Sequence, residues 1–129
     1  MEEINYFESI STLSEFNDLN SAEGVLKVQA SLANGDIPVE GVNVVVYKDL
    51  SDGRWVFFDG KTDKNGIIDL IRLPAPPYEQ PTIDNVAGAY ASYDLRAEKE
   101  GYNSMIKRLN IFSGIRTLQP LELEIKEEY

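Results

Sequence analysis

Apolar and polar residues alternate along most of the chain from position 24 onward. In the segment 25–32, Leu26 and Val28 fall on one side of an extended chain and Lys27 falls on the other. A repeat of two residues is typical of a strand with one buried face. Similar apolar stretches, separated by turn-forming residues, follow at 38–47, 55–58, 67–73, 90–99, 104–112 and 121–125. Short strands at this spacing predict an all-β protein, a single antiparallel β-sandwich of about seven strands with one shared core.

The first 23 residues follow a different pattern. Six acidic residues and no basic residue precede Lys27, so the arm is strongly acidic. Apolar residues recur there at every third position, at Ile4, Phe7, Ile10, Leu13 and Phe16. This spacing is compatible with an apolar stripe on a helix. We therefore predict an N-terminal arm over 1–23 and a sandwich over 24–129. The arm either lies on the body as a short helix or docks onto a partner chain.

Two segments rich in turn-forming residues separate the predicted strands. Residues 62–66 read Thr-Asp-Lys-Asn-Gly, and Asn-Gly favours a tight hairpin turn. A calcium-loop interpretation fails there, because the first and last ligand positions would be the cations Lys61 and Arg72. Four of the six prolines lie within 74–81, and proline cannot donate to a sheet ladder. We therefore predict a long loop over 74–88, which is a candidate binding element.

Composition removes several classes of chemistry. The chain of 129 residues contains no histidine and no cysteine. A Ser-His-Asp triad, a cysteine nucleophile and an imidazole or thiolate metal site are therefore excluded. The formal net charge of −10 argues against nucleic acid as a partner, because phosphate binding requires clustered lysine and arginine. We expect no cofactor and no metal centre.

No segment of the sequence predicts membrane insertion or export. The apolar runs are shorter than the roughly 20 residues of a membrane-spanning helix. The N-terminus also lacks the basic and apolar regions of a secretion signal. We therefore expect a soluble chain with no export signal of its own.

Two kinds of site remain open from the residues alone. Trp55, Tyr78 and Tyr90 are candidate ligand-binding residues, because aromatic rings stack on sugar faces. Trp55 shares a strand face with Phe57, which favours core packing for that face, whereas Tyr78 and Tyr90 flank the proline-rich loop. The 22 acidic residues also allow a pair of carboxylates for hydrolysis, although nothing in the sequence distinguishes one pair.

Several motifs resemble those of a known superfamily. Residues 38–46 resemble the Pro-x-x-Gly-Ala-x-Val-x-Val opening of carboxypeptidase-regulatory-like, transthyretin-like domains, and 62–66 resemble their Thr-Asp-x-x-Gly hairpin. Residues 93–102 resemble their strand that ends in Lys-x-Gly-Tyr. A narrower series is similar to the non-catalytic sandwich domain of clostridial spore-cortex-lytic and peptidoglycan-binding proteins. It consists of Leu-Pro-Ala-Pro-Pro at 73–77, Tyr-Ala-Ser-Tyr-Asp at 90–94 and a segment at 111–120 that ends in Gln-Pro.

The resemblance implies a fold, a setting and a role. The fold is a Greek-key, transthyretin-like sandwich. The setting is a bacterial cell-wall, spore or phage-related assembly, inside the cell or associated with the spore or phage. Enzymes of this fold and of a related sandwich, hydroxyisourate hydrolases and intradiol dioxygenases, depend on histidines that this chain lacks. The expected role is therefore a non-enzymatic structural or interaction module with a protein partner or a second copy. The alternatives are a module that binds peptidoglycan or another glycan and, more distantly, a carboxylate-only hydrolase.

Overall fold

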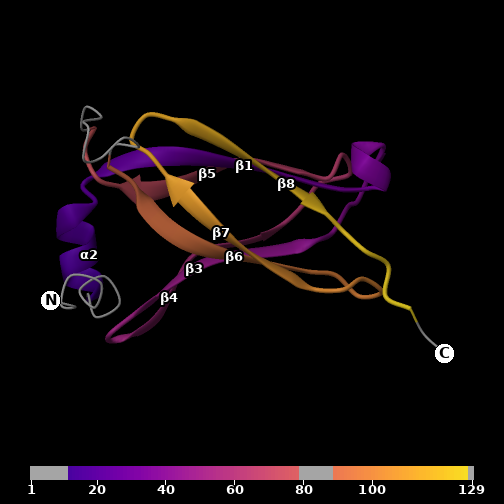
Figure 1. Ribbon diagram of the computed structural model, residues 1–129, viewed down its shortest axis with the longest axis horizontal. Helices are drawn as coiled ribbons and strands as arrows, with labels where there is room; N and C mark the ends of the chain where they lie inside the picture. The colour runs from indigo at the N-terminus through magenta and orange to yellow at the C-terminus, as the bar shows by residue number, and fades with distance from the viewer. Residues whose placement is uncertain (1–11, 79–88, 128–129) are drawn as a thin grey trace, which may run out of the picture.

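Two β-sheets pack face to face in the computed structural model, which describes residues 12–78 and 89–127 (Figure 1). One sheet has the order β5-β1-β8, with the short β2 beside the end of β1, and the other has the order β4-β3-β6-β7. The strands span Ala22–Leu32 (β1), Ile37–Pro38 (β2), Asn43–Leu50 (β3), Gly53–Lys61 (β4), Ile67–Ala75 (β5), Ala91–Glu98 (β6), Met105–Ile111 (β7) and Arg116–Glu122 (β8). A helix, α2, spans Leu13–Leu19, and a 3-10 turn spans Ala33–Gly35. The predicted β-sandwich with a short N-terminal helix is confirmed.

The core lies between the sheets and follows the alternation of the sequence. Leu26 and Val28 of β1 are fully buried, as are Val44 and Val46 of β3 and Leu95 of β6. Among the strand pairs of the described residues, β1 and β8 run parallel and the others run antiparallel. The antiparallel pairing predicted for the sandwich therefore does not extend to β8, which the chain enters after crossing from β7 in the opposite sheet.

Helix α2 closes one end of the sandwich. Thr12 caps it, because its hydroxyl oxygen accepts from the Glu15 amide at 3.2 Å and the Glu15 carboxylate accepts from the Thr12 amide at 3.0 Å. Phe16 is buried among the rings of Phe57 and Tyr93, with centroid distances of 5.5 and 5.9 Å. The helical stripe predicted in the arm is therefore confirmed at Phe16. The earlier apolar positions Ile4, Phe7 and Ile10 lie outside the described residues.

Tyr93 is a buried polar group of the core. It is 1% exposed, and its hydroxyl donates to the carbonyl of Pro74. Burial raises the pKa of this phenol well above its ordinary value, because the charged form would lose its hydration. The hydrogen bond joins β6 to the end of β5, so it links the two sheets where the Tyr93 ring contacts Phe16 of α2.

Two element boundaries differ from the sequence prediction. The predicted last strand at 121–125 is β8 at Arg116–Glu122, and Ile125 is 62% exposed. The inward positions of β8 carry Thr117 and Gln119, opposite Leu26 and Val28, so the apolar pattern of this strand begins only at Leu121. The predicted strand at 38–47 is divided into β2 and β3, because a turn containing Gly41, with φ +81°, separates them.

The proline-rich segment begins later than its prolines suggest. Pro74 lies within β5 and pairs with Glu23 of β1. β5 is an edge strand, so a residue without an N–H group fits on its open side. The predicted loop over 74–88 therefore starts after Ala75, and its residues 79–88 lie outside the described residues.

The tight turn predicted at 62–66 is confirmed, but it is not a hairpin, because β4 and β5 lie in opposite sheets and do not pair. The Asp63 carboxylate accepts from the amides of Asn65 and Ile67, both at 2.9 Å. The buried Thr62 hydroxyl donates to the Val39 carbonyl and accepts from the Val42 amide, also at 2.9 Å. These bonds fix the β4–β5 turn to the entrance of β3.

Candidate binding sites

Trp55 lies at the rim of the sandwich beside α2. A β-bulge places Trp55 opposite Lys48 and Phe58 opposite Val46, with Phe57 as the additional residue. Phe57 therefore packs on the core, whereas Trp55 remains 37% exposed. The core packing predicted for this strand face therefore holds for Phe57 but not for Trp55, which lies nearer the beginning of β4.

The Trp55 indole is held by a hydrogen bond rather than by a second ring. Its N–H donates to the Asp52 carboxylate at 3.0 Å. The other oxygen of Asp52 accepts from the Leu13 amide at 3.3 Å, at the beginning of α2. The hydrogen bond from Trp55 lowers the pKa of Asp52. Asp52 thereby joins the β3–β4 turn, the indole and the helix.

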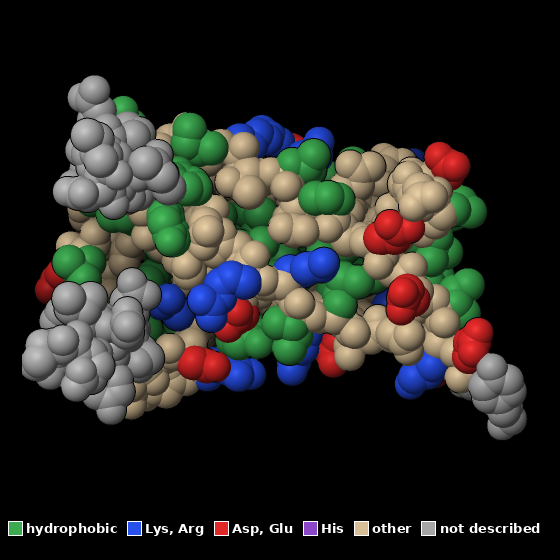
Figure 2. Space-filling view, in the orientation of Figure 1, with side chains coloured by type: hydrophobic (Ala, Val, Ile, Leu, Met, Phe, Trp, Pro, Cys, Tyr) green, Lys and Arg blue, Asp and Glu red, His purple; other side chains and the backbone are tan. Residues whose placement is uncertain are grey.

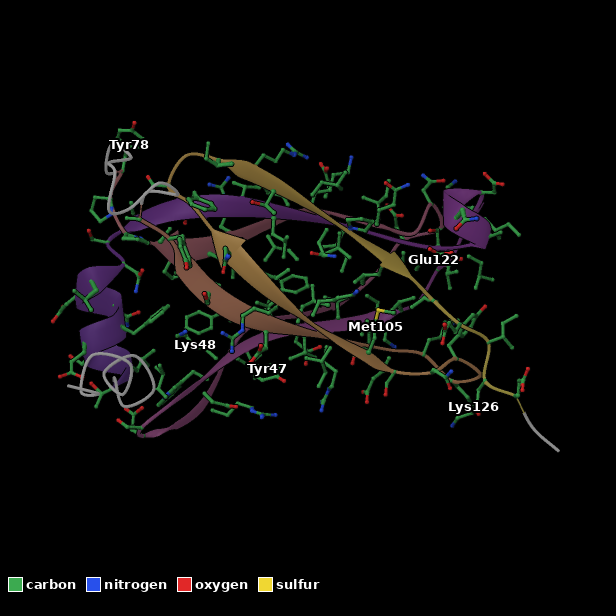
Figure 3. All side chains as sticks on the ribbon, viewed as in Figure 1. Tyr47, Lys48, Tyr78, Met105, Glu122 and Lys126 are labelled. Carbon is green, nitrogen blue, oxygen red and sulfur yellow. The ribbon has the colours of Figure 1, made fainter. Side chains whose placement is uncertain are left out.

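Tyr78 and Tyr90 flank the segment that lies outside the described residues. Tyr78 is 74% exposed and lies beyond the end of the sheets, near the α2 end of the molecule (Figure 3). Tyr90 is 44% exposed, and its ring lies 5.4 Å from the ring of Phe112 at an angle of 51°. Among the described residues no ring contact links Trp55, Tyr78 and Tyr90. The three predicted positions are therefore separate exposed rings rather than one platform.

The outer face of the β4-β3-β6-β7 sheet carries ion pairs as well as the exposed apolar side chains of Val56 and Ile106. On the β4-β3-β6-β7 face, Arg54 donates to both oxygens of Asp49, at 2.6 and 3.1 Å, and its guanidinium lies 4.1 Å from the ring centroid of Tyr47. This pairing lowers the pKa of Asp49. Arg108 and Asp94 add a second ion pair at 3.3 Å. Charged groups on this face are thus largely paired with one another.

The outer face of the β5-β1-β8 sheet carries exposed apolar side chains. Leu118 of β8 pairs with Lys27 of β1 and is 55% exposed. Leu70 of β5 lies beyond Lys27 on the other side of β1 and is 48% exposed. Figure 2 shows hydrophobic side chains at several places over β1 and β8. We call Leu70 and Leu118 the leucine surface.

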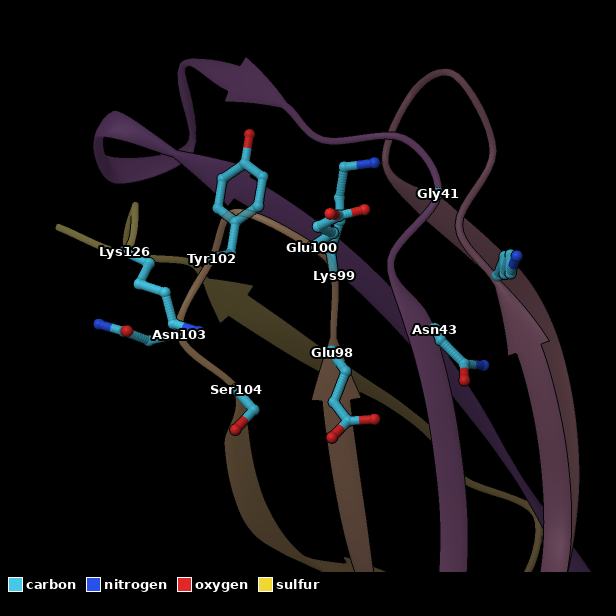
Figure 4. Close-up of a pocket in the computed structure, with 10 residues that line it drawn as sticks. Gly41, Asn43, Glu98, Lys99, Glu100, Tyr102, Asn103, Ser104 and Lys126 are labelled. Atoms are coloured by element: carbon cyan, nitrogen blue, oxygen red, sulfur yellow. The ribbon is translucent and has the colours of Figure 1, made fainter. Parts of the chain in front are cut away.

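A polar depression lies at the opposite end of the sandwich from α2 (Figure 4). It is an open cavity of about 840 Å³. Turns and strand ends from both halves of the chain line it: Gly41, Asn43, Lys61, Glu98, Lys99, Glu100, Tyr102, Asn103, Ser104 and Lys126. We call it the lysine depression, after its three lysines. Sequence analysis missed it, because those lysines are far apart in the chain and no local motif connects them.

Backbone hydrogen bonds hold the wall of the lysine depression in place. The amide of Asn103 donates to the Glu124 carbonyl at 2.9 Å, and the amide of Lys126 donates to the Gly101 carbonyl at 2.9 Å. The C-terminal segment is thereby fixed beside the β6–β7 turn. The Lys99 ammonium lies over Gly41, where it would be 3.2 Å from the Cβ atom of any larger residue. Gly41 is favoured here by its positive φ of +81°, whereas the Lys99 side chain could move aside for a Cβ atom.

The described residues offer no metal centre and no membrane-spanning helix. Within 12–78 and 89–127, no group of three or more acidic residues is arranged to hold an ion. In the same ranges no helix is long and apolar enough to cross a bilayer. Glu98 and Glu100 both line the lysine depression.

Comparisons with known proteins identify the fold. No protein-family model matches the sequence, and no curated protein matches it. Three solved structures share the architecture at 16% sequence identity. They are the Bacillus anthracis TIE protein (TM-score 0.52), 3-chlorocatechol 1,2-dioxygenase from Rhodococcus opacus (0.53) and GBS52, a minor pilin of Streptococcus agalactiae (0.54).

The likeness covers most of this chain but only part of each neighbour. It spans 81%, 81% and 84% of this chain and 17%, 60% and 47% of those proteins, which is less than two thirds of each. At this level of identity the comparison shows a shared β-sandwich fold. The chain is a β-sandwich protein with distant structural relatives of several kinds.

Proposed function

We propose that this chain is a transthyretin-like sandwich that acts as a non-enzymatic interaction module in a bacterial cell-wall, spore or phage-related assembly. The sequence motifs that resemble those domains support this proposal. Residues 62–66 form the turn between β4 and β5, and 93–102 form β6 with the turn that follows it. The narrower likeness to the non-catalytic domain of spore-cortex-lytic proteins supports the bacterial setting.

The leucine surface is the observation that supports a protein partner. Full burial of a large apolar side chain contributes roughly 1.5–3 kcal/mol relative to leaving it exposed to water. Here two leucines lie on the same outer face of a rigid sheet, and the Arg116–Asp69 ion pair at 2.7 Å spans β1 beside them. Lys27 lies between the two leucines, and protein interfaces combine apolar contacts of this kind with polar groups. A second copy of this chain is the partner that we propose.

Self-association is the direct test. We expect sedimentation velocity to show a concentration-dependent dimer, because the leucine surface would pack on the same surface of a second copy. The substitution Leu118→Asp should weaken that dimer at least about tenfold, since it places a charge in an apolar contact. Ile106→Asp is the matched control, because Ile106 is 60% exposed on β7 of the opposite sheet. A wild-type chain that stays monomeric at millimolar concentration would contradict the proposal.

Glycan binding is a second candidate, supported by the exposed ring of Tyr78. At 74% exposure this ring is open to a sugar face, unlike the partly covered Trp55 and Tyr90. We expect the purified protein to be retained on insoluble peptidoglycan at low salt and to lose most of that retention with Tyr78→Ala. Tyr90→Ala serves as the comparison. No retention of the wild type would reject this candidate, and release of soluble fragments would contradict a non-enzymatic role.

A further inference from the structure

The lysine depression concentrates unpaired cations in a protein whose formal net charge is −10. Each of the five arginines lies within 4 Å of a carboxylate, from Arg116 with Asp69 at 2.7 Å to Arg96 with Glu98 at 3.9 Å. Lys61, Lys99 and Lys126, by contrast, make no ion pair with any carboxylate in the part of the chain that the structure describes. Lys27, Lys64 and Lys107 also make no ion pair in the described residues, but they do not line the depression, so its distinction is that three such lysines share one cavity.

The acidic residues of the depression do not neutralise these lysines. The Glu98 carboxylate lies 3.9 Å from the Arg96 guanidinium on the outer face of the sheet, so this arginine already pairs with the negative charge of Glu98. Glu100 is then the remaining carboxylate of the lining, against three ammonium groups. The excess positive charge is small, so it suits a ligand with one carboxylate better than a polyphosphate. The glutamates would repel a dense array of negative charge.

Two hydroxyl groups beside the lysines also lack a hydrogen-bond partner among the described residues. The hydroxyls of Tyr102 and Ser104 make no hydrogen bond within residues 12–78 and 89–127, although both side chains line the depression. The Tyr102 ring stands on one side of the hollow, and the Lys99 side chain extends toward Gly41 on the other (Figure 4). A ring face, free hydroxyls and ammonium groups together match a sugar ring that bears a carboxylate.

From this arrangement we propose that the lysine depression binds an acidic sugar. Lys99 binds the carboxylate, Lys61 and Lys126 add positive charge from other parts of the lining, and Tyr102 and Ser104 contact the ring and its hydroxyls. The site lies at the end of the sandwich opposite Tyr78 and shares no residue with the leucine surface. The proposal of an acidic-sugar site goes beyond the proposed function, and a negative result for this site would not contradict that function.

The test is a titration of the full-length protein, followed by amide NMR shifts, with three probes. Glucuronate carries both the sugar ring and the carboxylate, glucose carries the ring alone, and acetate carries the carboxylate alone. We expect saturable shifts with glucuronate, centred on residues 99–104 and Gly41, at a lower dissociation constant than for either other probe. Equal binding of glucose or acetate, or shifts located elsewhere, would overturn the proposal.

Variants separate the site from general surface charge. Lys99→Gln should raise the dissociation constant of glucuronate about three- to fivefold, the scale of one exposed ion pair. The double change Lys61→Gln with Lys126→Gln should raise it further and provides a second measurement if Lys99→Gln alters the fold. Lys27→Gln makes the same charge change on the outer face of β1 and should leave binding unchanged. An equal effect of Lys27→Gln would reject the lysine depression as the site.

Discussion

Replacement of Phe16 by alanine is expected to lower the free energy of unfolding by about 3–5 kcal/mol, the usual cost of removing a buried aromatic ring. Phe16 is 4% exposed and contacts the rings of Phe57 and Tyr93. It is the buried residue of α2, a helix of seven residues that is too short to be stable alone. Loss of this ring therefore removes both core packing and the attachment of the helix. Chemical denaturation measures the change.

The single tryptophan gives a second readout of the same substitution. The Trp55 indole is bonded to Asp52, and Asp52 is bonded to the first residue of α2. If the helix detaches, the environment of the indole changes, and the native emission of Phe16→Ala should shift to longer wavelength. Leu19→Ala is the control on the same helix, because Leu19 is 66% exposed. That variant should stay within about 0.5 kcal/mol of the wild type. A Phe16→Ala protein equally close to the wild type would show that α2 is not held by this ring.

The sequence predicted the architecture where side-chain burial and alternation agree. β1 and β6 have apolar residues at each inward position, and both were placed within a few residues of their observed ends. β8 was misplaced, because Thr117 and Gln119 occupy inward positions and conceal its periodicity. The bulge at Phe57 could not be predicted either, because an extra residue in one strand is defined only by its pairing with a neighbouring strand.

The candidate sites were harder to predict than the fold. Single exposed rings such as Tyr78 could be found from their position beside a proline-rich segment. The lysine depression could not, because Lys61, Lys99 and Lys126 come from the ends of three separate elements and only the folded chain brings them together. Isolated lysines are common on any surface, so their number alone carries no signal. That three lysines without an ion pair line one cavity is visible only in the folded chain.

Substitution of Gly66 by alanine should destabilise the sandwich by about 2–5 kcal/mol. The left-handed conformation at φ +77° costs a non-glycine residue roughly 1–2 kcal/mol, and forcing an atom into a packed interior typically adds about 1–3. A Cβ atom here would lie 2.3 Å from the Ala30 carbonyl oxygen. That carbonyl accepts from the Val39 amide, and the Ala30 amide donates to Gly66, so β1 cannot move away without losing both bonds. Equilibrium denaturation of the purified variant measures the loss.

Gly114→Ala separates the two contributions. Gly114 has a similar φ of +71°, but nothing lies within 4 Å of the Cβ position. It therefore carries the conformational cost without the contact, and we expect a loss of about 1–2 kcal/mol. The difference between the two variants then measures how firmly the β4–β5 turn is packed against β1. If the two losses are equal, the close approach to Ala30 is relieved by a small movement of the turn, and the hydrogen bonds of Asp63 and Thr62 alone fix its position.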